Sequence, residues 1–235
     1  MARRPPLHRR FPRVPFPSGT PPEPPGRALI SQTLKLQSCA MDNDTVNKDF
    51  YNSSADSFDK IPFESLLPQM ILKYHQGKTV LDIGSGPGTL AAWMTSKGNE
   101  VVCIEPAVKP AAKAKEKGLT VHCTTIQEFE TDQHYDTILA ISSLIHVPKQ
   151  QLPSQIQKIA SLLNPGGIFF VSMIIGRSEG LEDPTNLGKM RYFAQWLSHE
   201  LDPMFSPFFT LLEEHLVHQK KMDRSFTLRA YKLKN

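Results

Sequence analysis

Five short apolar runs divide the chain after residue 78, and each is followed by a polar residue. Their length is typical of strands, and most of them lack the alternation of a strand that is exposed on one face. The expected strands are 79–81, 100–104, 119–123, 135–141 and 168–171. Two later runs, 211–217 and 226–231, favour a closing pair of antiparallel strands, because apolar and polar residues alternate in the second of them.

Apolar residues recur at helical spacing over 89–97 and again over 153–163. In the second stretch Ile156, Ile159 and Leu163 lie on one side of the expected helix. Strands that alternate with helices along a chain form a doubly wound, mostly parallel sheet. The sequence therefore predicts an α/β fold.

The segment 82–88 joins the first expected strand to the first expected helix, and it reads Asp-Ile-Gly-Ser-Gly-Pro-Gly. A strand that turns directly into a helix leaves the first N–H groups of that helix free for a ligand, and glycine lets the ligand approach the backbone closely. We expect Pro87 in the first helical turn, where its missing N–H costs nothing. A dinucleotide-binding loop would need its third glycine at position 89, where this chain has Thr89.

The acid-x-Gly-x-Gly-x-Gly pattern of residues 82–88 resembles the first motif of class I S-adenosylmethionine-dependent methyltransferases. The resemblance covers roughly residues 49–234. It implies a Rossmann-like sheet of seven strands, mostly parallel, with an antiparallel final hairpin. It also implies that the glycine loop wraps the methionine and ribose portion of a cofactor, S-adenosyl-L-methionine.

Three further segments match this family in order. Glu105 follows the second expected strand, where the family places an acid that accepts hydrogen bonds from the two ribose hydroxyls. The loop 124–129 corresponds to the adenine-binding loop, although the chain lacks the aspartate that is commonest there, and the opening 49–59 resembles a segment that closes over the cofactor. The resemblance assigns to the cofactor Tyr51, Asp82, Gly84, Ser85, Gly86, Gly88, Glu105, Pro106, Thr125, Ile126, Gln127, Ala140 and Ile141.

The segment 142–148 resembles the passage that lines the methyl-transfer site, and it contains His146, the candidate base. A base is required only if the nucleophile arrives protonated, and a purely structural role for this histidine is the alternative. The candidate acceptor contacts are the aromatic residues Phe58, Tyr192 and Trp196. For the last two, packing against the sheet is the alternative.

The resemblance implies that the chain is an enzyme that transfers a methyl group, by in-line displacement, to oxygen, nitrogen or carbon of a small-molecule acceptor. Two alternatives stay open: a methyltransferase for protein or RNA, and a non-catalytic module that binds S-adenosylmethionine. The Asn/Asp-Pro-Pro-Tyr/Phe motif of amino-directed DNA enzymes is absent from 141–144, which reads Ile-Ser-Ser-Leu. This absence disfavours nucleic acid as the partner.

The first forty residues differ from the rest in composition. Nine of the chain's twenty prolines fall in the first twenty-five positions. Residues 1–40 hold seven basic residues and one acidic residue, so they carry +6 of charge, whereas the whole chain carries +4 and residues 41–235 therefore −2. We expect 1–40 to be a disordered tail, or codons upstream of a true start at Met41, and 41–235 to form one domain. The positive net charge of the whole chain thus gives no support for nucleic-acid binding by the folded domain.

The cysteines, the histidines and the apolar runs bear on metal binding, on membrane association and on the cellular location. Cys103 and Cys123 fall in expected buried strands, which is typical of small core residues in a reducing cytoplasm. His215 and His218 would point to opposite faces of a strand, so we expect no metal site there. The longest apolar run is too short to span a bilayer, so no membrane partner is expected and the predicted location is cytoplasmic.

Overall fold

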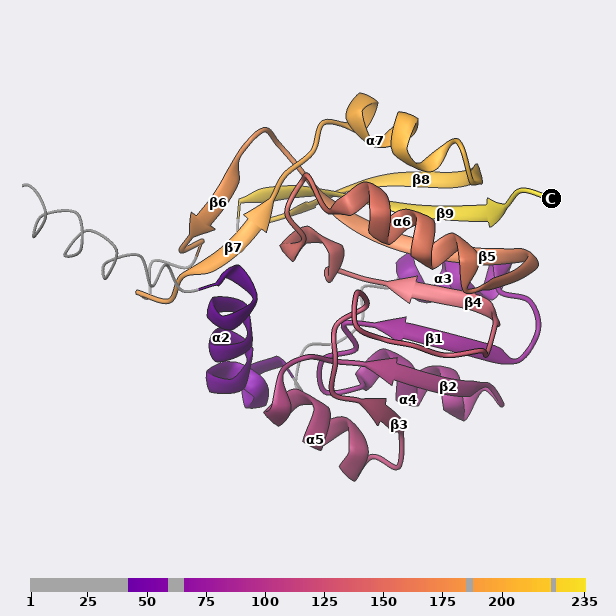
Figure 1. Cartoon of the computed structure of the whole chain (residues 1–235), viewed down its shortest axis with the longest axis horizontal. Coiled ribbons are helices and arrows are strands. Elements are labelled where there is room, and N and C mark those ends of the chain that lie inside the picture. The colour runs from indigo at the N-terminus through magenta and orange to yellow at the C-terminus, as the bar shows by residue number, and fades with distance from the viewer. Residues whose placement is uncertain (1–41, 59–65, 185–187, 221–222) are drawn as a thin grey trace, which may run out of the picture. The chain divides into compact units, whose positions relative to one another are not determined.

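The computed structural model of the chain describes residues 42–58, 66–184, 188–220 and 223–235. The predicted tail, residues 1–40, lies outside the described residues. Seven strands form one sheet in the order β3-β2-β1-β4-β5-β9-β8 (Figure 1). These strands are β1 (Thr79–Ile83), β2 (Glu100–Ile104), β3 (Thr120–His122), β4 (Tyr135–Ala140), β5 (Leu163–Ile175), β8 (Phe209–Gln219) and β9 (Arg224–Leu233).

The first five strands pair in parallel, and β9 runs antiparallel to both β5 and β8. The predicted doubly wound α/β sheet with an antiparallel final hairpin is therefore confirmed. The strand order reverses between β1 and β4, which are neighbours in the middle of the sheet. From β1 the chain continues to β2 on one side, and from β4 it continues to β5 on the other side. In open α/β sheets, ligands bind at such a switch point, outside the carboxyl ends of the strands.

Two apolar layers cover the faces of the sheet, because neighbouring residues of a buried strand point to opposite sides. Ile138 packs with the cluster that contains α6 (Leu152–Ser161) and α7 (Ser198–Phe205), whereas Leu139 packs with the cluster on the other face. That second face is covered by α3 (Leu66–Tyr74), α4 (Thr89–Ser96) and α5 (Val108–Glu116). None of the helices among the described residues is both long enough and apolar enough to cross a lipid bilayer.

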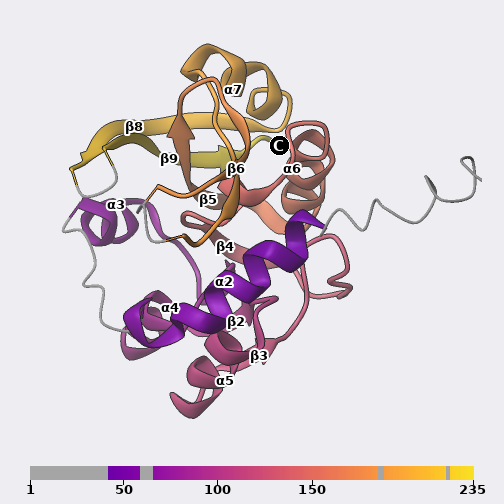
Figure 2. The ribbon, with the colours of Figure 1, turned by 90° about the vertical axis from the view of Figure 1, so that its left-hand side faces the viewer.

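A further helix and a small second sheet lie across the carboxyl ends of the parallel strands (Figure 2). The helix is α2 (Asn43–Phe58), and the two-stranded sheet pairs β6 (Glu179–Glu182) with β7 (Arg191–Ala194). Local sequence predicted neither element, because α2 has few buried residues and the two strands are only four residues long. Their position makes them a cover for the ligand-binding edge of the main sheet.

Three local expectations need correction. Strand β3 ends at His122, so Cys123 is exposed rather than part of a buried strand, whereas Cys103 is buried as predicted. The expected helix over 153–163 ends at Ser161, and Leu163 belongs to β5 instead of to the helix face. Within β5 the pairing with β4 shifts register, and Gly166 adopts a left-handed φ of 72°. Pro87 precedes the helix instead of entering it, because the left-handed Gly88 forms the N-cap of α4.

Candidate functional site

A cavity of about 340 Å³ lies at the carboxyl ends of β1, β2 and β4, and residues of α2 form its opposite wall. Its volume is within the range of small-molecule sites. The cavity brings together most of the residues that the sequence singled out. Those that line it are Tyr51, Phe58, Asp82, Gly84, Ser85, Gly86, Glu105, Pro106, Thr125, Ile126, Gln127, Ile141 and His146.

Four predicted residues do not line this cavity. Gly88 instead lets α4 approach α5, because a Cβ there would lie 2.8 Å from the Cβ of Ala114. Ala140 is buried inside β4, and Trp196 is buried in the core beneath the ammonium group of Lys149. Tyr192 also turns its ring away, since its hydroxyl donates a hydrogen bond to the carboxylate of Glu179. Neither of these two aromatic side chains lines the cavity.

The glycine loop keeps one wall of the cavity open. Gly86 has a φ of 56°, and a Cβ on it would meet nothing within 4 Å, so the space beside its backbone is free for a ligand. Gly84 serves packing instead, because a Cβ there would lie 2.3 Å from the Cβ of Ser143. The N–H groups of Gly84 and Ser85 donate to the carbonyl of Ile104 at 2.7 and 3.2 Å, which ties the loop to the end of β2.

Glu105 holds the same loop through its side chain. Oε2 accepts a hydrogen bond from the N–H of Gly86 at 2.8 Å, and Oε1 accepts one from the N–H of Ala107 at 2.8 Å. Each carboxylate oxygen has a second lone pair, so the group can still accept bonds from a ligand. Burial raises the pKa of Glu105, and the two backbone N–H groups oppose that rise.

A second carboxylate lies beside it at the end of β1. Asp82 is only 3% exposed, and its Oδ2 has no hydrogen-bond partner among the described residues. Burial, and after it the negative charge of Glu105, raise the pKa of Asp82 to about 7. In the described part of the chain neither of these buried carboxylates has a cationic partner, which favours a ligand that carries positive charge. We call residues 82–88 together with Glu105 the glycine-loop end of the cavity.

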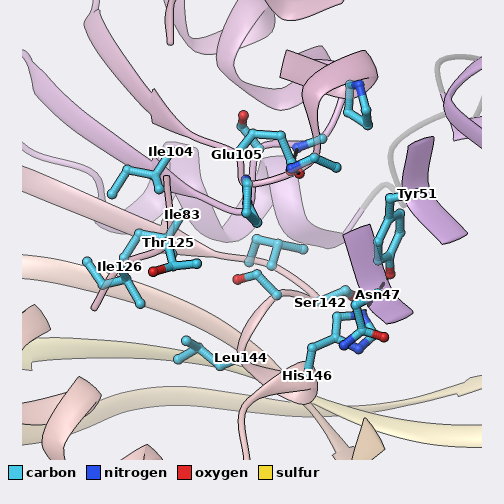
Figure 3. Close-up of a pocket in the computed structure, with 18 of the residues that line it drawn as sticks. Asn47, Tyr51, Ile83, Ile104, Glu105, Thr125, Ile126, Ser142, Leu144 and His146 are labelled. Atoms are coloured by element: carbon cyan, nitrogen blue, oxygen red, sulfur yellow. Dashed lines mark hydrogen bonds between the residues drawn. The ribbon is translucent and has the colours of Figure 1, made fainter. Parts of the chain in front are cut away.

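A tyrosine and a histidine meet at another end of the cavity (Figure 3). Tyr51 comes from α2, and His146 closes the 3-10 helix η1 (Leu144–His146) that follows β4. The Tyr51 hydroxyl lies 2.7 Å from Nε2 of His146, and Nδ1 of the same ring lies 2.7 Å from the carbonyl oxygen of Tyr192. We call these two side chains, with the α2 residues around them, the histidine end.

The carbonyl group decides the tautomer of this histidine. A carbonyl oxygen can only accept a hydrogen bond, so Nδ1 of His146 carries the proton and donates it to Tyr192. In the neutral ring Nε2 is then an acceptor, and the Tyr51 hydroxyl donates to it. Burial lowers the pKa of His146 to about 4, and the positive charge of Arg191 adds to this effect, so the ring is neutral at physiological pH.

Contacts between α2 and β7 hold the histidine end together. The side chain of Asn47 accepts a hydrogen bond from the N–H of Tyr192 at 2.9 Å. The guanidinium group of Arg191 lies 4.2 Å from the ring centre of Phe50 and 4.9 Å from that of Phe193. These contacts position the carbonyl that orients His146.

Sequence reasoning missed several residues that line the cavity. On α2 these are Asp44, Asn47 and Lys48. Their helical spacing from Tyr51 is the sequence signal that places them on the same side of the helix. Gln155 on α6 was also missed, although it is a polar residue beside an otherwise apolar helix face. Among the described residues there is no group of three or more His, Cys, Asp or Glu side chains that could hold a metal ion.

The model of a family described as "Methyltransferase domain" matches residues 58–213, which is more than half of the chain. A ubiquinone biosynthesis O-methyltransferase of Bradyrhizobium sp. (strain ORS 278) is 35% identical over 104 residues, or 42% of this chain and 40% of that protein. A protein of the same name from Rhodopseudomonas palustris (strain BisB5) is 28% identical over 149 residues, or 60% of this chain and 56% of that protein. The chain spans about half the length of these curated relatives.

Solved structures share the fold. The magnesium protoporphyrin IX methyltransferase of Synechocystis PCC 6803, with bound SAM, has a TM-score of 0.65 at 16% identity, over 85% of this chain and 100% of that one. The 1,6-didemethyltoxoflavin-N1-methyltransferase of Burkholderia thailandensis has a TM-score of 0.62 at 18% identity, over 93% of this chain and 94% of that one. The matched family region contains the glycine loop, Glu105 and His146. The chain therefore belongs to the methyltransferase domain family.

Proposed function

We propose that the chain is an S-adenosylmethionine-dependent methyltransferase that methylates a hydroxyl group of a small molecule. Family membership supports methyl transfer, and the curated relatives are named as O-methyltransferases of ubiquinone biosynthesis. The observation that carries the choice of a hydroxyl acceptor is the neutral His146 with its unprotonated Nε2 at the cavity wall.

The glycine-loop end fits the cofactor. Open space beside Gly86 admits its methionine and ribose portion, and Glu105 keeps lone pairs for ribose hydroxyls. The Oδ2 of Asp82, which has no hydrogen-bond partner in the described part of the chain, is a buried polar atom that a ligand would satisfy. When bound, S-adenosylmethionine supplies a methyl group on a positively charged sulfonium. The two carboxylates suit that charge.

The Tyr51–His146 pair handles the proton of the acceptor. Because the Tyr51 hydroxyl donates to Nε2, its oxygen can accept a hydrogen bond from an acceptor hydroxyl. As the methyl group would pass to the acceptor oxygen and its bond to sulfur would break, leaving the electron pair on sulfur, the proton of that oxygen would pass to Tyr51 and the proton of Tyr51 would pass to Nε2. The tyrosine is then unchanged, and His146 holds one additional proton until it is lost to solvent. General-base catalysis of this kind contributes about 10²- to 10⁴-fold.

The enclosure of the cavity supports a small acceptor. Tyr51 and Phe58 on α2 line the side opposite the strand ends, so cofactor and acceptor share one bounded space. A volume of about 340 Å³ is within the range of small-molecule sites. Holding both reactants in one such space supplies the proximity and orientation on which transfer depends.

The test is a methylation screen with S-adenosylmethionine that carries a labelled methyl group. The full chain is incubated with separated small-molecule, protein and RNA fractions of a cell extract, and Gly86→Val serves as the cofactor-binding control. We expect label in the small-molecule fraction, as a methyl ether, with the unaltered chain only. Label in protein or RNA instead would establish a macromolecular acceptor, and label on nitrogen or carbon would overturn the hydroxyl assignment. Cofactor binding without label in any fraction would indicate a non-catalytic module.

A further inference from the structure

A buried amide in the cavity wall has no partner. Gln155 on α6 is 2% exposed and lines the cavity, yet neither its Oε1 nor its Nε2 has a hydrogen-bond partner among the described residues. Buried side-chain amides are almost always hydrogen-bonded, since an unpaired one is costly. Its neighbours in the apolar cluster, such as Leu152 and Ile156, offer no polar atom in their side chains. The missing partner is therefore expected from the cavity.

The position of Gln155 on its helix shows which part of the cavity it faces. Gln151, Gln155 and Lys158 are spaced by four and three residues, so they share one side of the helix. Gln151 accepts a hydrogen bond from the side chain of Gln127 at 3.4 Å, and the ammonium group of Lys158 donates to the carbonyl of Gln127 at 2.8 Å. Gln155 lies between these two contacts and thus faces the loop that contains Thr125 to Gln127.

That part of the cavity lies away from the histidine end. Ile104 and Ile126 are on the opposite side of the cavity from Tyr51 and His146 (Figure 3). With Leu144, the two isoleucines form apolar walls that suit a flat ring. A carboxamide beside such walls offers one acceptor and two donors in a plane. The 6-amino group and a neighbouring ring nitrogen of adenine present the complementary donor and acceptor, and glutamine is a frequent bidentate partner of adenine.

We propose that Gln155 recognises the adenine of the cofactor through its amide, which accepts from the 6-amino group and donates to a ring nitrogen. This rests on the proposed function, because it requires an adenosyl ligand in the cavity. Gln155 would thereby select adenine over other purines. The loop residues 125–127 would contribute the rest of the ring's surroundings.

The test compares two ligands in binding calorimetry: S-adenosylhomocysteine and its analogue that lacks only the 6-amino group. The unaltered chain should prefer the adenine ligand by about 5- to 150-fold, the range for a bidentate amide contact. In Gln155→Met, which keeps the length of the side chain, this preference should fall to within about twofold. The melting temperature of Gln155→Met without ligand should rise, because an unpaired buried amide has been removed, and the ligand-induced increase should shrink.

Gln157→Met is the matched control, since Gln157 lies on the same helix but is exposed. It should keep both the preference and the ligand-induced increase in melting temperature. An unchanged preference in Gln155→Met, or none in the unaltered chain, overturns the assignment of Gln155 while leaving cofactor binding intact. Failure of the unaltered chain to bind S-adenosylhomocysteine at all overturns the proposed function and this inference together.

Discussion

At the glycine-loop end of the cavity, the ligand-binding groups come from residues 82–88 and from Glu105, which the parallel pairing of β1 and β2 places next to them. At the histidine end, Tyr51 and His146 are 95 positions apart, and the carbonyl that orients the ring is 46 positions further along. The first end is a local motif on adjacent strands, whereas the second exists only where three distant segments meet. A substitution at the first end should therefore affect cofactor binding, and one at the second should affect the chemical step.

The two ends also differ in electrostatics. Burial raises the pKa values of Asp82 and Glu105, which means that the folded protein disfavours the charged form of both side chains. Burial lowers the pKa of His146, so the same physical effect keeps the imidazole neutral. The cavity thus combines an end that favours a cation with an end that favours the removal of a proton.

The largest effect is expected for Gly86→Val. The valine side chain would occupy the space beside the loop, so binding of S-adenosylhomocysteine should fall below detection in calorimetry while the protein stays folded. Gly118→Val is the control, because Gly118 also has a positive φ and open space but does not line the cavity. It should show a similar loss of melting temperature and unchanged affinity. Equal affinities in Gly86→Val and the unaltered chain would contradict the placement of the cofactor.

The second effect concerns the histidine end alone. His146→Gln should lower kcat by about 10²-fold or more and leave the affinity for S-adenosylhomocysteine within about twofold, because only the proton acceptor is lost. Tyr51→Phe should lower kcat to a similar extent, since the proton passes through its hydroxyl. His134→Gln, at an exposed position, is the control and should change neither quantity. A His146→Gln variant with the original kcat would leave this histidine a structural role only.

Glu105→Ala should reduce cofactor affinity by about 2–3 kcal/mol, or roughly 30- to 150-fold, because charged hydrogen bonds to the ribose and to the glycine loop are lost together. Glu105→Gln should recover part of this loss, since its amide oxygen can still accept from one partner. Titrations should show equal losses for S-adenosylmethionine and S-adenosylhomocysteine, which share the ribose. Tight binding of NAD by the unaltered chain would argue for a different cofactor.

The smallest effect is a pair of opposite pH dependences in the free energy of unfolding. The folded pKa of Asp82 is raised, so its contribution to stability is present below its unfolded value near 3.8 and is lost as pH rises through about 7. The folded pKa of His146 is depressed, so its contribution is present above 6.5 and is lost as pH falls through about 4.

Denaturant titrations across this range should separate the two groups. Asp82→Asn should abolish the decline in the free energy of unfolding toward pH 7, and His146→Gln should abolish the decline toward pH 4. Each of these declines should amount to roughly 1–2 kcal/mol after screening by cavity water. The unaltered chain should be flatter between pH 4 and 6.5 than either variant, because the two trends oppose each other there. Parallel curves for all three proteins would show that neither group is held away from its ordinary pKa.

The sequence determined the sheet and the glycine-loop end, because both depend on short-range physics. Strands of five or six residues, most of them apolar and buried, form β1, β2 and β4, and the alternating glycines at 84–88 specify a loop that leaves its backbone open. The acid that follows β2 then falls beside this loop through parallel pairing. These features require only strand periodicity, glycine conformation and the rule for ligand sites in open sheets.

Only the tertiary structure decided the rest. That Tyr192 contributes its carbonyl and not its ring, that α2 covers the cavity, and that Gln155 lines it all depend on contacts between distant segments. Sequence periodicity reports which side of an element is apolar, but not which element will pack there. The orientation of His146 and the unpaired amide of Gln155 arise from that packing, which no local pattern of residues encodes.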